Sequence, residues 1–337
     1  MGLAIKRSCL TKCFLFVLTV SLSVSVLTSP AKSADNPQRF GEWLADIRTE
    51  ALARGISQTT LDEAFDGLKP IPRVIELDRS QPEFRLTFSE YLNRVIPPSR
   101  VIRGRKKLRD HQTLLAKISQ RYGVQSRFLV SLWGIETDFG RSIGGFSVIG
   151  ATATLAYDGR RSTFFRNELF HALRILEDGH IAASKMRGSW AGAMGQIQFM
   201  PSSFHNFAVD YQGDGRIDIW GDPGDVFASA ANYLSQSGWV SKQIWGRKVR
   251  LPRPFNQRLV GGKTRMRLSD WQALGVRRPN GQDLPKKPNL MASVVAPDGI
   301  DGKTFIVYDN YRVILKWNAS DFFGLAVGIL ADRIVRR

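Results

Sequence analysis

A carboxylate interrupts an apolar helical pattern in the stretch Leu132-Trp133-Gly134-Ile135-Glu136-Thr137-Asp138-Phe139-Gly140. At helical spacing, Glu136 shares one face with large apolar residues, namely Phe128, Leu129, Leu132, Trp133 and Phe139. Burial of a carboxylate is costly unless the group is paired or protonated, and desolvation raises its pKa. We therefore interpret Glu136 as a candidate proton donor. The alternative is a structural Glu136 that pairs with a buried arginine.

The N-terminus has the features of a secretory signal. A basic segment precedes an uncharged apolar stretch, residues 14–27, that is too short for a comfortable membrane span. Small residues follow at two candidate cleavage sites, Ser29-Pro30-Ala31 and Lys32-Ser33-Ala34. We expect a signal peptide over residues 1–34. An uncleaved N-terminal anchor is the alternative.

Cysteine content and charge narrow the functional classes. Cys9 and Cys13 both precede the apolar stretch, so neither stands where a lipoprotein cysteine would, and the mature chain would contain no cysteine. The formal charge of +18 would fall to +14, because residues 1–34 contain four basic residues and no acidic one. A basic surface suggests a polyanion as partner. Export argues against nucleic acid and favours an envelope polymer such as peptidoglycan; a solvated surface without a dedicated partner is the alternative.

Periodicity predicts a mainly helical chain. Two short helices are expected within residues 40–66, before a break at Pro70-Ile71-Pro72. Further helices are expected over residues 84–95, 106–122, 124–139, 162–178, 225–238 and 321–333. Gly123 is expected to end the helix that precedes the one carrying Glu136.

The pattern changes after Trp239, where proline and glycine become frequent. Strands are expected over residues 248–251, 264–268, 290–296 and 304–308. These strands predict a small antiparallel unit before the last helix, and hence an α+β, mainly α, fold class. We expect one domain over residues 35–337: a helical part over 35–239, a β-containing region over 240–318 and a terminal helix over 319–337.

A second informative stretch combines small residues with polar and apolar ones: Ser189-Trp190-Ala191-Gly192-Ala193-Met194-Gly195-Gln196-Ile197-Gln198-Phe199-Met200-Pro201-Ser202-Ser203-Phe204. Glycine and alanine let a ligand approach the backbone closely. Gln198 can both donate and accept hydrogen bonds to a polar ligand such as a sugar, and Phe199 and Met200 can line an apolar rim. The alternative is a tight helix–helix crossing, which also favours small residues.

A third stretch, Asp210-Tyr211-Gln212-Gly213-Asp214-Gly215-Arg216-Ile217-Asp218, matches the first half of an EF-hand calcium loop. The glutamate expected at position 12 is replaced by Gly221, although Asp222 and Asp225 lie just beyond. A longer loop could therefore complete the ligand shell. An Asp/Gly-rich turn without metal is the alternative.

Together these stretches resemble the lytic murein transglycosylase B family, peptidoglycan lyases with a lysozyme-like core. Three segments occur in the family's order and spacing: Gly-Ile-Glu-Thr-Asp-Phe-Gly, Gly-Ala-Met-Gly-Gln-Ile-Gln-Phe-Met-Pro-Ser-Ser and Gly-Asp-Gly-Arg-Ile-Asp-Ile-Trp-Gly-Asp-Pro. The resemblance covers roughly residues 40–333. It implies a lysozyme-like helical catalytic core with an additional helical region and a small antiparallel β region.

The resemblance also implies residue roles. Glu136 matches the family's single catalytic acid, and Trp317 stands where the family has a tyrosine, which keeps a stacking surface but loses the hydroxyl. Other implied substrate contacts are Ser189, Gln198, Arg160, Arg161, Tyr233 and Asn318, with Tyr91 as a less close match and Met200 at the apolar rim. The implied calcium ligands are Asp210, Gln212, Asp214, the Arg216 carbonyl and Asp225. Gln212 and an extra residue before Asp225 depart from the family's pattern.

Most glycosidases use two carboxylates, whereas one strong candidate stands out here. As a hypothesis, Glu136 protonates the glycosidic oxygen between N-acetylmuramic acid and N-acetylglucosamine, then removes the proton from the muramic C6 hydroxyl, which forms a 1,6-anhydro ring. No cofactor is expected for the chemistry, and a structural Ca²⁺ is possible. The alternatives are a hydrolysing muramidase, a non-catalytic peptidoglycan-binding protein and a calcium-dependent carbohydrate-binding module.

The expected partners are peptidoglycan glycan strands and, in addition, other cell-wall enzymes. We expect a monomer in the periplasm that is not a lipoprotein, and no C-terminal peptidoglycan-binding repeat, since the chain stops at Arg337.

Overall fold

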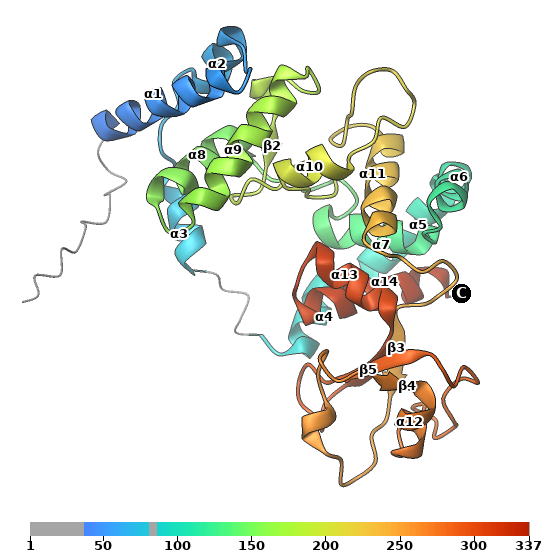
Figure 1. Ribbon diagram of the computed structural model, residues 1–337. Coiled ribbons are helices and arrows are strands. Elements are labelled where there is room, and N and C mark those ends of the chain that lie inside the picture. Colours follow the sequence, from blue (N-terminus) through green and yellow to red (C-terminus); the bar gives the residue numbers. More distant parts are fainter. Residues whose placement is uncertain (1–36, 81–85, 337) are drawn as a thin grey trace, which may run out of the picture. The chain divides into compact units, whose positions relative to one another are not determined.

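The computed structural model describes residues 37–80 and 86–336 (Figure 1). The expected signal peptide lies outside the described residues. The α-helices are α1 (Pro37–Ala53), α2 (Gln58–Phe65), α3 (Pro72–Ser80), α4 (Phe88–Val95), α5 (Pro98–Asp110), α6 (Gln112–Tyr122), α7 (Ser126–Thr137), α8 (Val148–Asp158), α9 (Ser162–Glu177), α10 (Pro201–Phe207), α11 (Pro223–Gln236), α12 (Leu268–Ala273), α13 (Asp309–Trp317) and α14 (Asp321–Val335). Two short 3₁₀ turns are η2 (Ala183–Lys185) and η3 (Gln257–Leu259).

The strands form two antiparallel sheets, which confirms the α+β, mainly α, fold class. They are β1 (Phe146–Ser147), β2 (Arg187–Gly188), β3 (Gly246–Val249), β4 (Met266–Arg267), β5 (Met291–Val295) and β6 (Thr304–Val307). The larger sheet has the order β3-β6-β5-β4, and Val307 of β6 lies opposite both Gly246 and Ser293. This sheet is the antiparallel unit that the sequence predicts before the last helix.

Two predicted elements differ in detail. The helix expected over residues 106–122 is divided at His111, whose backbone angles (φ −107°, ψ 17°) leave the helical region. The His111 ring packs edge-on against Trp133 and Phe227, and this packing accompanies the change of direction. The strand expected over 264–268 is shorter, because α12 begins at Leu268 with Asp270 bonded back to the Arg267 backbone.

Helix α7 positions the candidate site because it is packed on nearly every side. Eight of its residues are buried, and α14 lies beside it (Figure 1). The buried Ser131 hydroxyl donates to the Val327 carbonyl at 2.6 Å, which fixes α14 against α7. A Cβ on Gly134 would lie 2.8 Å from the Phe139 ring, so glycine is required where the chain folds back after the helix. The large buried area makes α7 a rigid support.

Within the described ranges, no single helix is long and apolar enough to cross a membrane. Helices α13 and α14 together have the length and apolar composition of a membrane span, but the chain bends by 118° between them.

Candidate active site

Glu136 lies in the last turn of α7 and lines a cleft of about 800 Å³. The chain leaves the helix directly after it, since Asp138 and Phe139 both have positive φ (51° and 65°). The cleft is lined by residues of α4, α7 and the α13–α14 junction: Leu86, Tyr91, Val95, Ile135, Glu136, Asn318, Ala319, Ser320, Asp321, Phe322 and Phe323. Its volume and mixed lining are typical of a ligand site. The apolar-face carboxylate predicted from sequence is therefore half-buried at a cleft wall.

Trp317 holds the carboxylate of Glu136. Its indole Nε1–H donates to Glu136 Oε1 at 2.8 Å. The indole thus supplies a hydrogen-bond donor as well as the stacking surface that the resemblance implies for Trp317. A donor to a charged acceptor is stronger than a neutral hydrogen bond and fixes its orientation. The sequence predicts only a stacking role for Trp317, because nothing in the local pattern places its indole N–H beside Glu136.

Two aromatic rings pack against the Trp317 indole. Its ring centroid lies 4.7 Å from that of Tyr233 and 5.1 Å from that of Phe199. The Tyr233 hydroxyl donates to the Lys316 carbonyl at 2.7 Å, and burial raises the pKa of Tyr233. Tyr233 therefore fixes the end of α13 and reaches the site through Trp317.

Two further predicted residues line the cleft directly. Tyr91 of α4 packs 5.5 Å from the Phe322 ring. Asn318 follows α13, and its side-chain carbonyl accepts the Ser320 backbone N–H at 3.1 Å. The structure thus brings Tyr91, Asn318 and Glu136 together from segments that are far apart in sequence.

The cleft also contains a carboxylate that sequence reasoning missed. Asp321 lines it at the first position of α14 and accepts the Tyr311 hydroxyl at 2.6 Å. Burial, followed by the hydrogen bond and charge of Asp321, raises the pKa of Tyr311 far above its usual range. An acidic residue in the first turn of a helix is ordinary, so the sequence around Asp321 gives no signal of a site.

The Asp138 carboxylate is paired with arginine side chains. It accepts hydrogen bonds from Arg100 at 3.1 Å and Arg103 at 2.7 Å, and Arg141 lies 3.2 Å away. Burial acts to raise the pKa of Asp138, but the hydrogen bonds and charges of Arg103 and Arg100 outweigh it and leave the pKa lowered. Asp138 is therefore an ion-paired residue.

The glycine-rich stretch is a turn-rich loop that is anchored to α7. No helix occurs between Ser189 and Met200, so the helix-crossing interpretation is wrong. Gln196, which sequence reasoning did not assign, accepts the Trp133 indole N–H at 2.8 Å, and its carbonyl accepts the Thr137 hydroxyl at 2.6 Å. The residue type alone gave no signal for this role.

The predicted contact residues of this loop are already engaged with the chain. The Ser189 hydroxyl accepts the Ala193 N–H at 3.1 Å. Gln198 has positive φ (51°), and its amide donates to the Ile143 and Gly195 carbonyls, both at 3.0 Å. Met200 packs against the small cluster around Phe165. None of these side chains belongs to the cleft lining given above.

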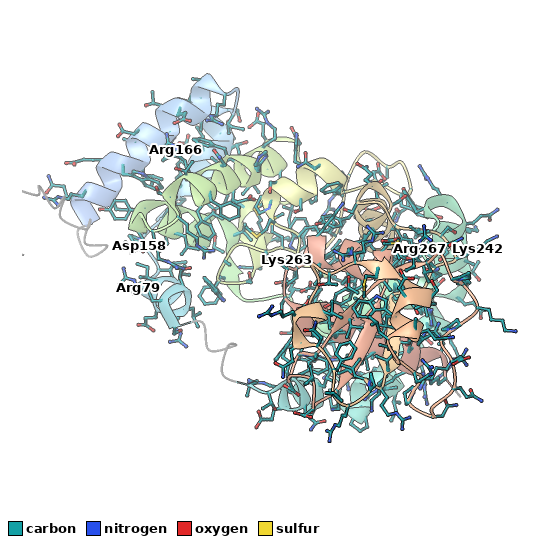
Figure 2. The ribbon with its side chains drawn as sticks, turned by 60° about the horizontal axis from the view of Figure 1, so that its bottom comes forward. Arg79, Asp158, Arg166, Lys242, Lys263 and Arg267 are labelled. Carbon is teal, nitrogen blue, oxygen red and sulfur yellow. The ribbon has the colours of Figure 1, made fainter. Side chains whose placement is uncertain are left out.

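Arg160 and Arg161 converge on Asp78, a residue that sequence reasoning missed. Asp78 of α3 is only 2% exposed; Arg160 Nε donates to it at 2.6 Å, and Arg161 also pairs with it. Burial alone would raise the pKa of Asp78, but both guanidinium groups lower it. Figure 2 shows a neighbouring pair at the same α3–α8 junction, Arg79 and Asp158, joined at 2.8 Å. The arginine pair thus ties the loop after α8 to α3, outside the lining residues of the cleft.

The Asp/Gly loop satisfies its carboxylates with backbone N–H groups. Asp210 accepts from Gly213 at 2.6 Å and Gly215 at 2.8 Å. Asp225 is 2% exposed and accepts from Tyr211 at 2.8 Å and Asp218 at 2.6 Å. Across residues 37–80 and 86–336, no three acidic, histidine or cysteine side chains converge as a metal cluster.

The electrostatics of this loop nevertheless suit a hard cation. Burial, and then the charges of Asp222 and Asp210, raise the pKa of Asp225, although two backbone hydrogen bonds act against them. A cation would relieve this repulsion, and carboxylate, amide and carbonyl oxygens are the donors that calcium prefers. Gln212 and Asp214 lie in the same loop, and Asp214 accepts the Arg216 N–H at 2.9 Å. The residues present fit calcium by donor type.

Comparison with known proteins places the chain in a family. The transglycosylase SLT domain family matches residues 39–332. The membrane-bound lytic murein transglycosylase B of Escherichia coli (strain K12) is 32% identical over 299 residues, which cover 83% of this chain and 79% of that protein.

Solved structures show the same lysozyme-like fold. SltB3 from Pseudomonas aeruginosa, in complex with NAG-NAM-pentapeptide, is 46% identical with a TM-score of 0.86, over 88% of this chain and 79% of that one. SLT35 from Escherichia coli, in complex with calcium, is 28% identical with a TM-score of 0.75, over 89% and 93% of the two chains. The family match spans nearly the whole described chain and carries a cleft with Glu136 at its wall, and the chain therefore belongs to the transglycosylase SLT domain family of lytic murein transglycosylases.

Proposed function

We propose that this chain cleaves the β-1,4 bond between N-acetylmuramic acid and N-acetylglucosamine without water, and that Glu136 acts first as acid and then as base. One observation carries this proposal. Glu136 stands at the wall of a cleft of about 800 Å³, with its Oε1 fixed by the Trp317 indole N–H at 2.8 Å. A proton donor needs this combination of an open approach and a fixed orientation.

The reaction uses one side chain twice. Protonated Glu136 gives its proton to the glycosidic oxygen as the bond to the muramic anomeric carbon breaks. The resulting carboxylate takes the proton of the muramic C6 hydroxyl while that oxygen bonds to the anomeric carbon. The products are a free 4-hydroxyl on N-acetylglucosamine and a 1,6-anhydromuramoyl end. Because the substrate supplies the nucleophile, no second carboxylate has to position a water molecule.

Other residues position the substrate in this proposal. Tyr91 and Asn318 line the cleft beside Glu136, and their ring and amide can stack on and hydrogen-bond to the sugars. Trp317 fixes the acid, while Tyr233 fixes Trp317. We propose that Ser189, Gln198 and Met200 shape the loop that faces the bound glycan. Arg160 and Arg161 would meet its peptide at the α3–α8 junction.

Two structures of one relative support the substrate class. SltB3 of Pseudomonas aeruginosa was solved with NAG-NAM-pentapeptide and also with NAG-anhNAM-pentapeptide. The second ligand carries the anhydro end that non-hydrolytic cleavage would produce.

Mass spectrometry of the fragments released from purified peptidoglycan tests the proposal. We expect anhydromuramoyl ends from the wild-type chain, and release by Glu136→Gln that is slower by about 10²–10⁴-fold. Lytic activity of Glu136→Gln at the wild-type rate would refute the assignment of Glu136.

A hydrolysing muramidase is the second candidate, because Asp321 is another carboxylate in the same cleft. In that reaction Asp321 would activate a water molecule, and the products would carry reducing ends. The hydrogen bond from Tyr311 and the place of Asp321 at the start of α14 favour a structural role instead. We therefore expect Asp321→Asn to retain anhydro products.

We further propose that the Asp/Gly loop binds a structural Ca²⁺ through Asp210, Gln212, Asp214, the Arg216 carbonyl and Asp225. When bound, the ion would neutralise the carboxylates and stiffen the segment before α11. The calcium complex of SLT35 supports this proposal. Thermal unfolding with calcium and with a chelator tests it, and an unchanged midpoint would refute it.

Location follows from the substrate. The relatives act on murein, so we propose that this chain works in the periplasm, where an N-terminal signal peptide over residues 1–34 would deliver it. N-terminal sequencing of the secreted protein tests the cleavage site.

A further inference from the structure

Two adjoining hollows lie on the larger sheet and on the sides of α4 and α14. One, of about 600 Å³, lies between residues 248–253 and 300–304. The other, of about 250 Å³, is lined by residues of β3, α4, β6 and α14 and of the segments next to them. Lys248 lines both hollows, so they adjoin at this side chain.

Positive charge dominates this surface. Its cations, which define what we call the basic surface, are Lys248, Arg250, Arg253, Lys303, Arg333 and Arg336. Its two acids are already engaged. Asp301 pairs with Arg253 in an exposed bridge, which contributes little, and Asp332 bonds to Arg127 and the Trp245 indole.

Most of these cations form no salt bridge with another described residue. Lys303 donates to the Ser89 hydroxyl at 3.0 Å rather than to a carboxylate. Among the residues that the structure describes, Lys248, Arg250 and Arg336 form no salt bridge within 4.0 Å. Lys248 and Arg250 are exposed, whereas Val249 between them is buried, so both extend outward from the same face of β3 and its continuation. Uncompensated cations in a hollow create a site for an anionic ligand.

The basic surface and the cleft contact different parts of the same two helices: neighbouring faces of α4, and the first turn of α14 as against its later turns. On α4, Tyr91 lines the cleft and the next residue, Leu92, lines the smaller hollow. On α14, Phe322 and Phe323 line the cleft, while Ile329 and Arg333 line the hollow. A glycan strand in the cleft therefore leaves the basic surface free for a different part of the polymer.

We propose that the basic surface binds the carboxylate-bearing stem peptides of a peptidoglycan strand other than the one in the cleft; this rests on the proposed function. The cations lie in hollows between loops, so several of them can contact one stem-peptide carboxylate that enters a hollow. A flat lipid headgroup layer would meet only the outermost of them. The surface would hold the enzyme on the wall between cleavage events.

The test compares two double charge reversals in the inactive Glu136→Gln chain, so that the wall stays intact. Lys248→Glu/Arg250→Glu changes the basic surface. Lys286→Glu/Lys287→Glu makes the same change in net charge on an exposed loop before β5. We expect the first variant to bind sedimented peptidoglycan about tenfold more weakly at low salt, and the second to bind nearly as the parent does. On glycan strands stripped of peptides, the two variants should bind equally.

Several outcomes would overturn the proposal. The first is that both double variants bind peptidoglycan equally weakly. The second is that Lys248→Glu/Arg250→Glu also binds peptide-free glycan strands more weakly than the control does. The third is that this variant loses binding only to anionic phospholipid vesicles, which would indicate a membrane as the partner instead. If Lys248→Glu/Arg250→Glu lacks a cooperative unfolding transition, Arg336→Glu at the end of the chain replaces it in the same comparison.

A second readout separates this proposal from the proposed function. With Glu136 restored, both double variants should cleave a short soluble glycan at the parent rate, whereas Lys248→Glu/Arg250→Glu should show a raised KM on intact walls. If the parent enzyme does not cleave the soluble glycan, the proposed function is refuted. A parent-like KM on walls would refute the binding role alone.

Discussion

The cleft and the Asp/Gly loop use carboxylates in opposite ways. In the cleft, Glu136 faces a large open volume and is oriented by an indole N–H. In the loop, Asp210 and Asp225 each accept two or more backbone N–H groups within their own segment. Backbone bonds of this kind favour the charged form and fix a turn, although at Asp225 burial outweighs them and the pKa is raised. A carboxylate in an open cleft can instead meet a ligand and exchange a proton.

Replacement of the Glu136 carboxyl group should have the largest effect on kcat. Glu136→Gln keeps the size and the Trp317 contact but cannot act as acid and base, so we expect kcat to fall by about 10²–10⁴-fold. Circular dichroism should show an unchanged fold. As a control in the loop, Asp214→Asn should retain most activity. A loop variant as inactive as Glu136→Gln would break the contrast between the two regions.

Calcium should affect the loop and leave the chemistry nearly unchanged. At a calcium concentration 100-fold above the Kd, binding would add about 2.7 kcal/mol of stability, and we expect a rise of several degrees in Tm. Asp225→Asn should abolish this rise, because it removes a buried charged ligand. Differential scanning calorimetry with calcium and with chelator measures the effect. Complete loss of catalysis in chelator, with the protein still folded, would give the loop a direct role in the reaction.

The indole N–H should have a smaller effect than the acid that it orients. Trp317→Phe keeps a ring against Phe199 and Tyr233 but loses the donor to Glu136, and we expect kcat to fall about tenfold, as one charge-assisted hydrogen bond is lost. Trp317→Tyr restores a hydrogen-bond donor on an aromatic ring, so it should recover part of the rate. Equal rates for Trp317→Phe and wild type would show that the orientation of Glu136 does not depend on this contact.

The smallest expected effect is a pH-dependent change in stability when Asp138 is replaced. Its pKa is lowered in the fold by Arg103 and Arg100, so its contribution to stability is present above the unfolded pKa of about 3.9 and is lost as pH falls through the lower folded value. Asp138→Asn should cost about 1 kcal/mol at pH 7, and the difference in Tm should close below about pH 4. A difference that persists at pH 2 would indicate packing rather than charge.

Much of the fold followed from sequence periodicity. The helix carrying Glu136, the αL glycine at Gly123 and the strands near residues 291–307 were predicted and are observed. Helix α8 was not predicted, because its residues are buried on all sides and it has no polar face to mark a period. Helix α13 was also missed, although it delivers Trp317 to the site.

The candidate site was less accessible to sequence reasoning. Glu136 was visible because one charged residue on an apolar face is conspicuous. Its contact with Trp317 joins residues 181 positions apart, and no local pattern reports such a distance. The same holds for Asp78 beneath the arginine pair and for Asp321, which resembles an ordinary residue in the first turn of a helix.

The central claim is that Glu136 serves as acid and base in a cleavage that uses no water. The most direct measurement is digestion of peptidoglycan by the wild-type chain in water labelled with heavy oxygen, followed by mass spectrometry of the muramic ends. The account predicts anhydro ends, each lighter by one water molecule than a reducing end and free of the label. Reducing ends that carry the label would contradict it and assign the cleft to hydrolysis.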